Sequence, residues 1–100
     1  MALEIKWTKQ ATTSFYNTID YLEEEWSERY AQKFVQIVNR FLHTLQEQPE
    51  IGKIEVAEKG IRGFVLSRQN TVFYRIKGQW IILLKFFDNR QHPSKKFTTN

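Results

Sequence analysis

The chain has 100 residues, of which 41% are hydrophobic and 26% charged, and this length and composition fit one globular domain over residues 1–100. It contains no cysteine, which excludes disulfides and thiolate zinc sites. The N-terminal residues lack the pattern of a signal peptide, and no apolar run reaches membrane-spanning length. We therefore expect a cytoplasmic protein with no cofactor, no metal and no membrane partner.

The net charge of +4 is unevenly distributed along the chain. Residues 1–50 hold five Lys and Arg against eight Asp and Glu, whereas residues 51–100 hold ten against three. Clustered positive charge attracts nucleic acid or an acidic protein. The C-terminal half is therefore the part expected to meet such a partner, and the alternative is an ordinary solvated surface rich in lysine.

The first half of the chain is predicted to contain one strand and two helices. Residues 3–7 alternate apolar and polar side chains, which is the pattern of a half-buried strand. Thr8 and Ser27 can each cap a helix, and apolar residues recur at spacings of three and four after each cap. The second pattern stops near Pro49 and Gly52. The two helices are expected to form an antiparallel hairpin.

The second half is rich in β-branched and aromatic residues separated by turn-like segments. Three strands are predicted at 61–66, 71–76 and 80–87, joined as an antiparallel meander. Residues 53–59 have a mixed pattern, which leaves a loop or an irregular strand, and the polar tail from 91 onward is expected to be mobile over about 93–100. The predicted fold class is α+β, in the order β-α-α-β-β-β, with the helices packed on one face of the sheet. The neighbour of the first strand stays open.

A turn centred on Arg68 and Gln69 would set Arg62 opposite Arg75 in the strand pair. Such a pairing suggests a surface that meets an anion, although ordinary solvated arginines explain it equally well. The same register leaves apolar residues on both faces of the sheet, of which a helical hairpin covers one. Residues 53–59, the tail or another protein could cover the second face, and we favour another protein for at least part of it, at three aromatic rings: Phe64, Phe73 and Phe86.

Established catalytic motifs are missing from the sequence. It has no Gly-rich phosphate loop and no His-x-x-x-His metal pair. His43 falls inside the second helix pattern, where a structural or solvated role is the default. His92 follows the last predicted strand, a position where functional side chains often lie on a rigid support. Tyr74, in the middle of a predicted strand, is expected to pack in the core.

Arg90 is the first candidate for a functional side chain. Its guanidinium can hold a phosphate through two hydrogen bonds and stabilise charge that develops on a scissile phosphodiester. Four further cations would assist it: Arg62, Arg75, Lys95 and Lys96. The alternative is a structural arginine paired with Asp88 or with a helix carboxylate.

Several segments, in this order and spacing, resemble the RelE/ParE toxin superfamily. They cover nearly the whole chain: IKWT at 5–8 before a helix with Ala11, the pair Ala31 and Phe34, QPEIG at 48–52, GIR at 60–62, VFYRI at 72–76 and DNRQ at 88–91. The resemblance implies a compact α+β toxin of a type II toxin–antitoxin system. Such a toxin arrests growth until a cognate antitoxin wraps around it in a hetero-oligomer.

The resemblance implies one of two targets. RelE-like members cut mRNA in the ribosomal decoding site, using basic residues and often a tyrosine or histidine near the C-terminus, whereas ParE-like members inhibit DNA gyrase without such chemistry. Arg62 and Arg90 match arginines that recur in the family. No tyrosine follows Tyr74, and Phe97 has no hydroxyl, so His92 is the candidate acid or base.

Two modes of toxicity therefore stay open at this point. The first is a metal-free endoribonuclease, with Arg62, Arg90 and His92 as catalytic residues and with Arg75, Lys95 and Lys96 binding RNA or another target. The second is a gyrase inhibitor. A hypothesis of a different class is a non-toxic binding module that uses a basic sheet surface for nucleic acid or an acidic protein.

Overall fold

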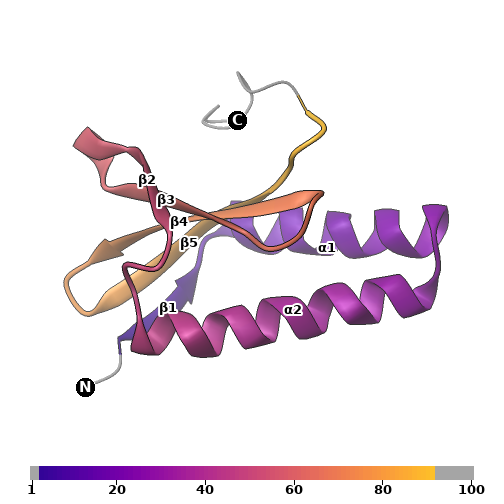
Figure 1. Ribbon diagram of the computed structural model, residues 1–100, viewed down its shortest axis with the longest axis horizontal. Coiled ribbons are helices and arrows are strands. Elements are labelled where there is room, and N and C mark those ends of the chain that lie inside the picture. The colour runs from indigo at the N-terminus through magenta and orange to yellow at the C-terminus, as the bar shows by residue number, and fades with distance from the viewer. Residues whose placement is uncertain (1–2, 92–100) are drawn as a thin grey trace.

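The computed structural model describes residues 3–91 (Figure 1). Its elements, in chain order, are β1 (Glu4–Trp7), α1 (Lys9–Glu25), α2 (Glu28–Glu47), β2 (Lys53–Val56), the 3-10 helix η1 (Ala57–Lys59), β3 (Ile61–Val65), β4 (Asn70–Lys77) and β5 (Trp80–Asp88). The predicted α+β order is confirmed. The segment left undecided at 53–59 supplies one more strand and a short 3-10 helix. The tail at 93–100 lies outside the described residues.

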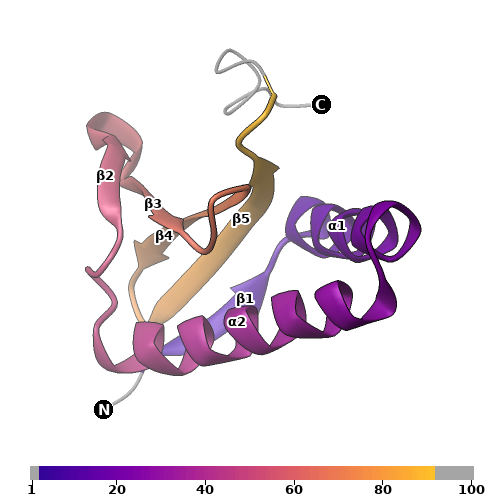
Figure 2. The same cartoon turned by 45° about the vertical axis from the view of Figure 1, so that its right-hand side comes forward.

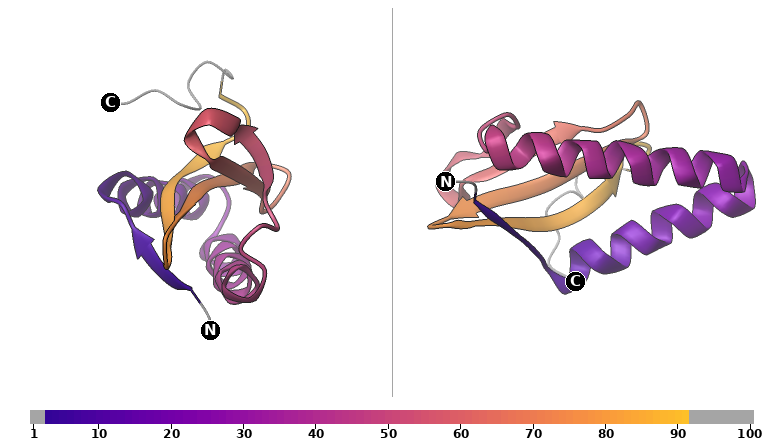
Figure 3. Two further views of the ribbon diagram at one scale, coloured as in Figure 1. Left: turned by 90° about the vertical axis from the view of Figure 1, so that its left-hand side faces the viewer. Right: turned by 90° about the horizontal axis from the view of Figure 1, so that it is seen from below.

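The five strands form one mixed sheet in the order β1-β5-β4-β3-β2. Strands β2 to β5 pair antiparallel, and β1 lies parallel to β5, so the first and last strands of the chain are neighbours (Figure 2). Both helices lie on the same face of this sheet (Figure 3). We call the opposite face the open face, because no helix of residues 3–91 packs on it.

Both predicted helix caps are present. The Thr8 hydroxyl oxygen accepts a hydrogen bond from the Ala11 amide at 3.0 Å, and the Ser27 hydroxyl oxygen accepts one from Tyr30 at 3.3 Å. These bonds satisfy amide groups that have no partner in the first turn of a helix. The Thr8 hydroxyl also lies 2.9 Å from the carbonyl oxygen of Leu83, which ties the start of α1 to β5.

The main core lies between the helices and the sheet. Phe86 of β5 is 5% exposed, and its ring centroid lies 5.5 Å from that of Trp7, 5.3 Å from Phe15 and 6.2 Å from Phe34. A second, smaller apolar cluster lies on the open face: Ile61, Phe73 and Phe87, with Val56 and Leu84 packed against them. The core therefore joins both helices to β1 and β5 and leaves little apolar packing on the open face.

The predicted register of β3 and β4 is wrong by one residue. Arg62 pairs with Tyr74 and Arg75 pairs with Ile61, so the two arginines do not face each other. The connecting loop has three residues rather than two, because the Leu66 amide donates to the Asn70 carbonyl at 2.9 Å. One additional loop residue moves every side chain of a strand to the other face of the sheet.

The prediction that Phe64, Phe73 and Phe86 lie on one face of the sheet is also wrong, because β5 contains a bulge. Phe73 pairs with Lys85 and Tyr74 with Leu83, so Leu84 has no partner and the alternation of side chains shifts there. Phe86 consequently points to the helices, where Phe64 also packs, whereas Phe73 lies on the open face and is 1% exposed. The three rings predicted to bind a partner protein therefore do not share a face.

Candidate functional site

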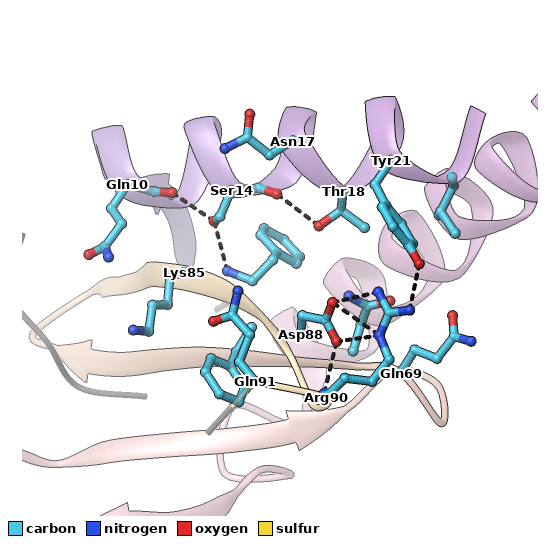
Figure 4. A pocket seen from close by; sticks show the side chains of 14 residues that line it. Gln10, Ser14, Asn17, Thr18, Tyr21, Gln69, Lys85, Asp88, Arg90 and Gln91 are labelled. Carbon is cyan, nitrogen blue, oxygen red and sulfur yellow. Dashed lines mark hydrogen bonds and ion pairs between the residues drawn. The ribbon is translucent and has the colours of Figure 1, made fainter. Parts of the chain in front are cut away.

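A groove lies where α1 faces the last part of β5. Strand β1 pairs with β5 only as far as Leu83, and beyond this point the edge of β5 faces α1. The Ser14 hydroxyl oxygen accepts a hydrogen bond from the Phe86 amide at 2.9 Å, in the place of a neighbouring strand. The groove has a volume of about 390 Å³ (Figure 4). Polar side chains prevail in its lining, among them Gln10, Asn17, Thr18, Gln69, Asp88, Arg90 and Gln91.

Arg90 closes one end of this groove (Figure 4). Its Nε and Nη2 donate to the Asp88 carboxylate at 3.0 and 2.6 Å, and its Nη1 donates to the Tyr21 hydroxyl at 2.5 Å. The guanidinium carbon also lies 4.6 Å from the centroid of the Tyr21 ring. The structure thus shows the pairing with Asp88 that the sequence left as an alternative. Arg90 joins the end of β5 to α1.

The charge of this pair is fixed by its hydrogen bonds. The hydrogen bonds that Arg90 donates lower the pKa of the Asp88 carboxyl. The pKa of the Arg90 guanidinium is raised, mainly by its hydrogen bonds to Asp88 and secondly by the one to Tyr21. Asp88 is therefore ionised and Arg90 charged at neutral pH. A phosphate that approaches Arg90 has to compete with a carboxylate already bound to it.

Arg62 lies at a different place, beside the loop that follows α2. Its Nη1 donates to the Gly52 carbonyl at 2.8 Å and to the Glu50 carbonyl at 3.2 Å. Its Nη2 also lies 3.7 Å from the Glu50 carboxylate, and the side chain is only 20% exposed. This arginine therefore holds the loop onto β3.

The sheet separates Arg62 from Arg90. Arg62 pairs with Tyr74 of β4. Asp88, the partner of Arg90, pairs with Asn70, four residues earlier on the same strand. Four residues of a strand span about 13 Å. Arg62, which was predicted to assist Arg90, therefore lies apart from it in the sheet.

Tyr74 is fully buried, as predicted, and its hydroxyl fixes the same loop. It donates to the Pro49 carbonyl at 2.8 Å and accepts from the Gly52 amide at 2.8 Å. Burial raises the pKa of Tyr74. The loop between α2 and β2 is thus held by a tyrosine and an arginine from two neighbouring strands.

Replacing Tyr74 by phenylalanine removes both bonds and leaves the Gly52 amide without this partner. We expect the free energy of unfolding to fall by about 1–3 kcal/mol. Urea denaturation at neutral pH measures this loss. Tyr16, which is 59% exposed, offers a matched control, since its change to phenylalanine should cost less than about 0.5 kcal/mol. Equal stability of the two variants would show that the Tyr74 hydroxyl does not hold the loop.

The Asp88 carboxyl makes a testable contribution to stability that depends on pH. Its pKa is lowered in the folded state, so its stabilisation is present above the ordinary pKa near 3.9 and is lost as the pH falls through the folded value. Because the pair is partly exposed, we expect at most about 1 kcal/mol. Asp88→Asn should therefore be less stable than the wild type at pH 7 in urea denaturation, and the difference should shrink as the pH falls through the folded-state pKa of Asp88. A difference that persists unchanged in acid would contradict this.

Two further cations, Arg75 and Lys85, lie on the open face. Arg75 lies on it, and its buried Nε has no hydrogen-bond partner among the described residues. Lys85 faces Phe73, and its Nζ lies 5.6 Å from the centroid of the Phe87 ring. Burial lowers the pKa of Lys85.

Lys53 and Glu55 are candidate functional residues that the sequence analysis missed. Lys53 and Glu55 are two residues apart on β2, so both lie on the open face, beside a hollow of about 350 Å³ above Gly63. A Cβ atom on Gly63 would lie 2.9 Å from the Phe73 ring and 3.1 Å from the Glu55 side chain. A glycine inside a strand often marks such a close approach, and this was the signal in the sequence. A carboxylate and an ammonium beside one hollow can exchange protons or bind a polar group.

Other predicted residues lie apart from these places. His43 is exposed on α2, and His92, Lys95 and Lys96 lie outside the described residues. Within 3–91, no group of three His, Asp or Glu side chains could hold a metal ion. In the same part of the chain no helix is sufficiently long and apolar to span a membrane.

The fold places the chain among the small α+β toxins of bacterial toxin–antitoxin systems. A chain of the chromosomal ParDE system from P. aeruginosa is similar with a TM-score of 0.72 and 25% identity, over 87% of this chain and 96% of that chain. The family model described as ParE toxin of type II toxin-antitoxin system, parDE, matches residues 5–93. The chain belongs to this family.

Two further solved structures share the fold. The YoeB/ParE toxin from Agrobacterium tumefaciens has a TM-score of 0.63 and 12% identity, over 87% of this chain and 99% of that chain. A YoeB–YefM complex from Staphylococcus aureus has a TM-score of 0.53 and 16% identity, over 86% and 95%. No curated protein sequence matches the chain.

Proposed function

We propose that the chain is the toxin of a type II toxin–antitoxin system and arrests growth by inhibiting DNA gyrase, until a cognate antitoxin binds it. The family match over residues 5–93 supports the toxin reading, and the similar P. aeruginosa chain comes from a ParDE system. The solved YoeB–YefM complex contains a chain of similar fold, which supports the proposal that this chain also binds a protein partner. Because gyrase lies in the cytoplasm, the proposal places the chain there.

One observation favours a binding mode over RNA cleavage. Arg90 binds Asp88 and Tyr21 through its Nε, Nη1 and Nη2 atoms, and Arg62 binds the loop after α2 through its Nη1 atom. Cleavage of a phosphodiester needs preorganised donors directed at the charge that develops on the phosphate. Both arginines are already bound to groups of the fold, and they pair at different positions along the sheet, so they do not form one set of donors directed at a phosphate. The arrangement therefore favours a protein-binding surface over the active site of a ribonuclease.

The open face is the surface that we assign to the target. Five described cations lie on it, against the carboxylates of Glu4 and Glu55: Lys6, Lys53, Arg75, Lys77 and Lys85. Lys6 lies over the Trp80 ring, 5.6 Å from its centroid, so an aromatic ring accompanies the charge at this corner. Such a face attracts acidic protein surfaces or DNA, both of which a gyrase–DNA complex presents.

Ribosome-dependent mRNA cleavage is the second candidate function. The observation that favours it is the hollow above Gly63, where Lys53 and Glu55 lie together. In this mode one of them would transfer the proton of the attacking 2′-hydroxyl. The RNA would then be bound by Arg75, Lys95 and Lys96, and His92 would be the second group that transfers a proton.

Induced expression in a bacterial host tests the proposal. The chain alone should arrest growth, and co-expression of the small open reading frame beside its gene should restore it. The arrest should be accompanied by a DNA-damage response with mRNA intact. Glu55→Gln should remain toxic if gyrase is the target, whereas loss of toxicity together with mRNA fragments in the wild type would support the second candidate. Unchanged growth would contradict both.

A further inference from the structure

Arg75 lies in the middle of the open face. Its strand, β4, is the central one of the five, with β5 and β1 on one side and β3 and β2 on the other. Arg75 pairs with Ile61 of β3 and with Ile82 of β5. Phe73 precedes it by two residues and belongs to the apolar cluster of the same face. The Arg75 side chain is therefore surrounded by apolar side chains at its base.

The hydrogen bonding of this side chain is incomplete. The Arg75 Nε atom is buried, and no acceptor of residues 3–91 lies within hydrogen-bond distance of it. Neither of the two ion pairs in this part of the chain involves Arg75. A buried donor without a partner lowers the stability of a fold, and such donors are rare. On a face that no helix of residues 3–91 covers, this donor indicates a side chain that gains its acceptor when a partner binds.

A carboxylate is the acceptor that fits this side chain best. A guanidinium binds a carboxylate through Nε and one Nη atom at the same time. Arg90 binds Asp88 of this chain in that way, at 3.0 Å from Nε and 2.6 Å from Nη2. Because the Nε of Arg75 is buried, its guanidinium has to turn outward to form such a pair. Binding then satisfies a donor that is unsatisfied in the free chain.

We propose that Arg75 anchors an acidic segment of a partner protein on the open face, through a carboxylate bound to its Nε and one Nη atom. Apolar side chains beside that carboxylate pack on Ile82 and Leu84, which are half-buried on this face. Arginines over apolar surroundings are common among the residues that dominate protein interfaces. The inference deepens the proposed function and rests on it in one respect, since gyrase is the partner to which we assign the acidic segment.

The carboxylates of the open face lie at its edges and leave its centre to the cations. Glu4 is on β1 and Glu55 on β2, and one other strand separates each of these strands from β4. Strands in a sheet lie about 4.8 Å apart, so β1 and β2 are each about 10 Å from β4. Physiological salt screens charges over ~8 Å. A carboxylate at Arg75 is therefore closer to Lys77 on the same strand and to Lys85 on the next than to either glutamate.

A nucleic acid fits this face less well than a protein. Phe73 and Phe87 are 1% and 3% exposed, so bases cannot stack on their rings. The exposed ring of Trp80 already has the Lys6 ammonium over it, 5.6 Å from its centroid. Binding of DNA without sequence preference depends on many phosphate contacts, whereas a single well-oriented guanidinium is enough to hold one carboxylate. The open face therefore favours an acidic protein segment.

Titration of the purified chain with short probes tests the inference without gyrase. The first probe is a capped peptide that alternates glutamate with valine, and its control carries glutamine in place of glutamate. A single-stranded oligothymidine is the nucleic-acid probe. The acidic peptide should shift the NMR signal of the Arg75 Nε–H group, because this group gains a hydrogen bond. The glutamine peptide and the oligothymidine should bind at least about tenfold more weakly.

Substitutions at Arg75 separate its charge from its geometry. Arg75→Lys keeps the charge but cannot donate two parallel hydrogen bonds, so it should weaken binding of the acidic peptide about fivefold. Arg75→Met removes the charge and the buried donor together. It should abolish binding, while the urea midpoint of unfolding stays at the wild-type value or rises. The matched control is Arg40→Gln, an exposed arginine of α2, which should change the affinity less than about twofold.

Four results would overturn the inference: an unchanged Arg75 signal in the presence of the acidic peptide, wild-type affinity in Arg75→Met, a clear fall of the urea midpoint in that variant, or tighter binding of oligothymidine than of the acidic peptide. Inhibition of gyrase by the wild-type chain separates this outcome from failure of the proposed function. If the chain inhibits gyrase but the peptide leaves the Arg75 signal unchanged, the Arg75 assignment fails alone. If the peptide binds at Arg75 but gyrase is unaffected, the proposed target fails and the Arg75 assignment stands.

Discussion

Replacing Phe86 by alanine is expected to lower the free energy of unfolding by about 3–5 kcal/mol, the usual cost of removing a buried phenylalanine. The ring is 5% exposed and meets the rings of Trp7, Phe15 and Phe34. It thereby joins the last strand to β1 and to both helices. A domain of this size has a total stability of about 5–15 kcal/mol, so the variant should be marginally folded. Urea denaturation followed by circular dichroism measures the loss.

Val65→Ala is the control for this experiment. Val65 is 63% exposed on the open face, and its truncation should cost less than about 0.5 kcal/mol. If Phe86→Ala proved as stable as this control, the ring would not belong to the core. It would then be available to a partner protein, as its sequence position first suggested.

Gly52→Ala is expected to cost about 3 kcal/mol. An added Cβ would lie 2.6 Å from the Tyr74 hydroxyl oxygen and 2.7 Å from its Cε1 atom, closer than such contacts permit. Overpacking of this kind costs about 1–3 kcal/mol. Displacement of the ring also breaks the bond from the Gly52 amide to Tyr74, which costs a further ~1–3 kcal/mol. Thermal unfolding and urea denaturation should both show the loss.

Gly78→Ala separates this steric effect from backbone strain. Gly78 has a φ of 60°, and no atom would lie within 4 Å of its Cβ. Alanine there should cost only about 1–2 kcal/mol, through its left-handed conformation. A Gly52→Ala variant that is less destabilised than Gly78→Ala would show that Tyr74 moves aside easily and does not fix the loop after α2.

The elements that depend on local signals could be predicted from the sequence. Thr8 and Ser27 were identified as caps because a cap is decided by a few neighbouring residues. The predicted strands agree with β3, β4 and β5 to within one residue at each end, because β-branched and aromatic runs are local as well. The parallel pairing of β1 with β5 joins the two ends of the chain, and no local pattern indicates it.

The sheet faces could not be predicted because single residues decide them. The loop after Leu66 has one residue more than expected, and Leu84 is an unpaired bulge. Each of these shifts the alternation of side chains. Arg75 was thereby separated from Arg62, and Phe86 from the open face, although β1, β3, β4 and β5 were located correctly.

The candidate site was predictable only where its contacts are close in sequence. Asp88 lies two residues before Arg90, and its pairing with Arg90 was foreseen as an alternative. The contact of Arg90 with Tyr21, 69 residues away, depends on the packing of α1 against β5. Lys53 and Glu55 were missed because their segment had no clear periodicity, and without a predicted strand there the alternation that places both on one face could not be applied.

The central claim is that this ParE-family chain arrests growth by inhibiting gyrase. The most direct test is the supercoiling of relaxed plasmid DNA by purified gyrase as the chain is titrated into the reaction. We predict that supercoiling falls as the chain approaches gyrase in concentration, and that a stoichiometric excess stops it. Supercoiling at the full rate in the presence of a large excess of folded chain would contradict the claim.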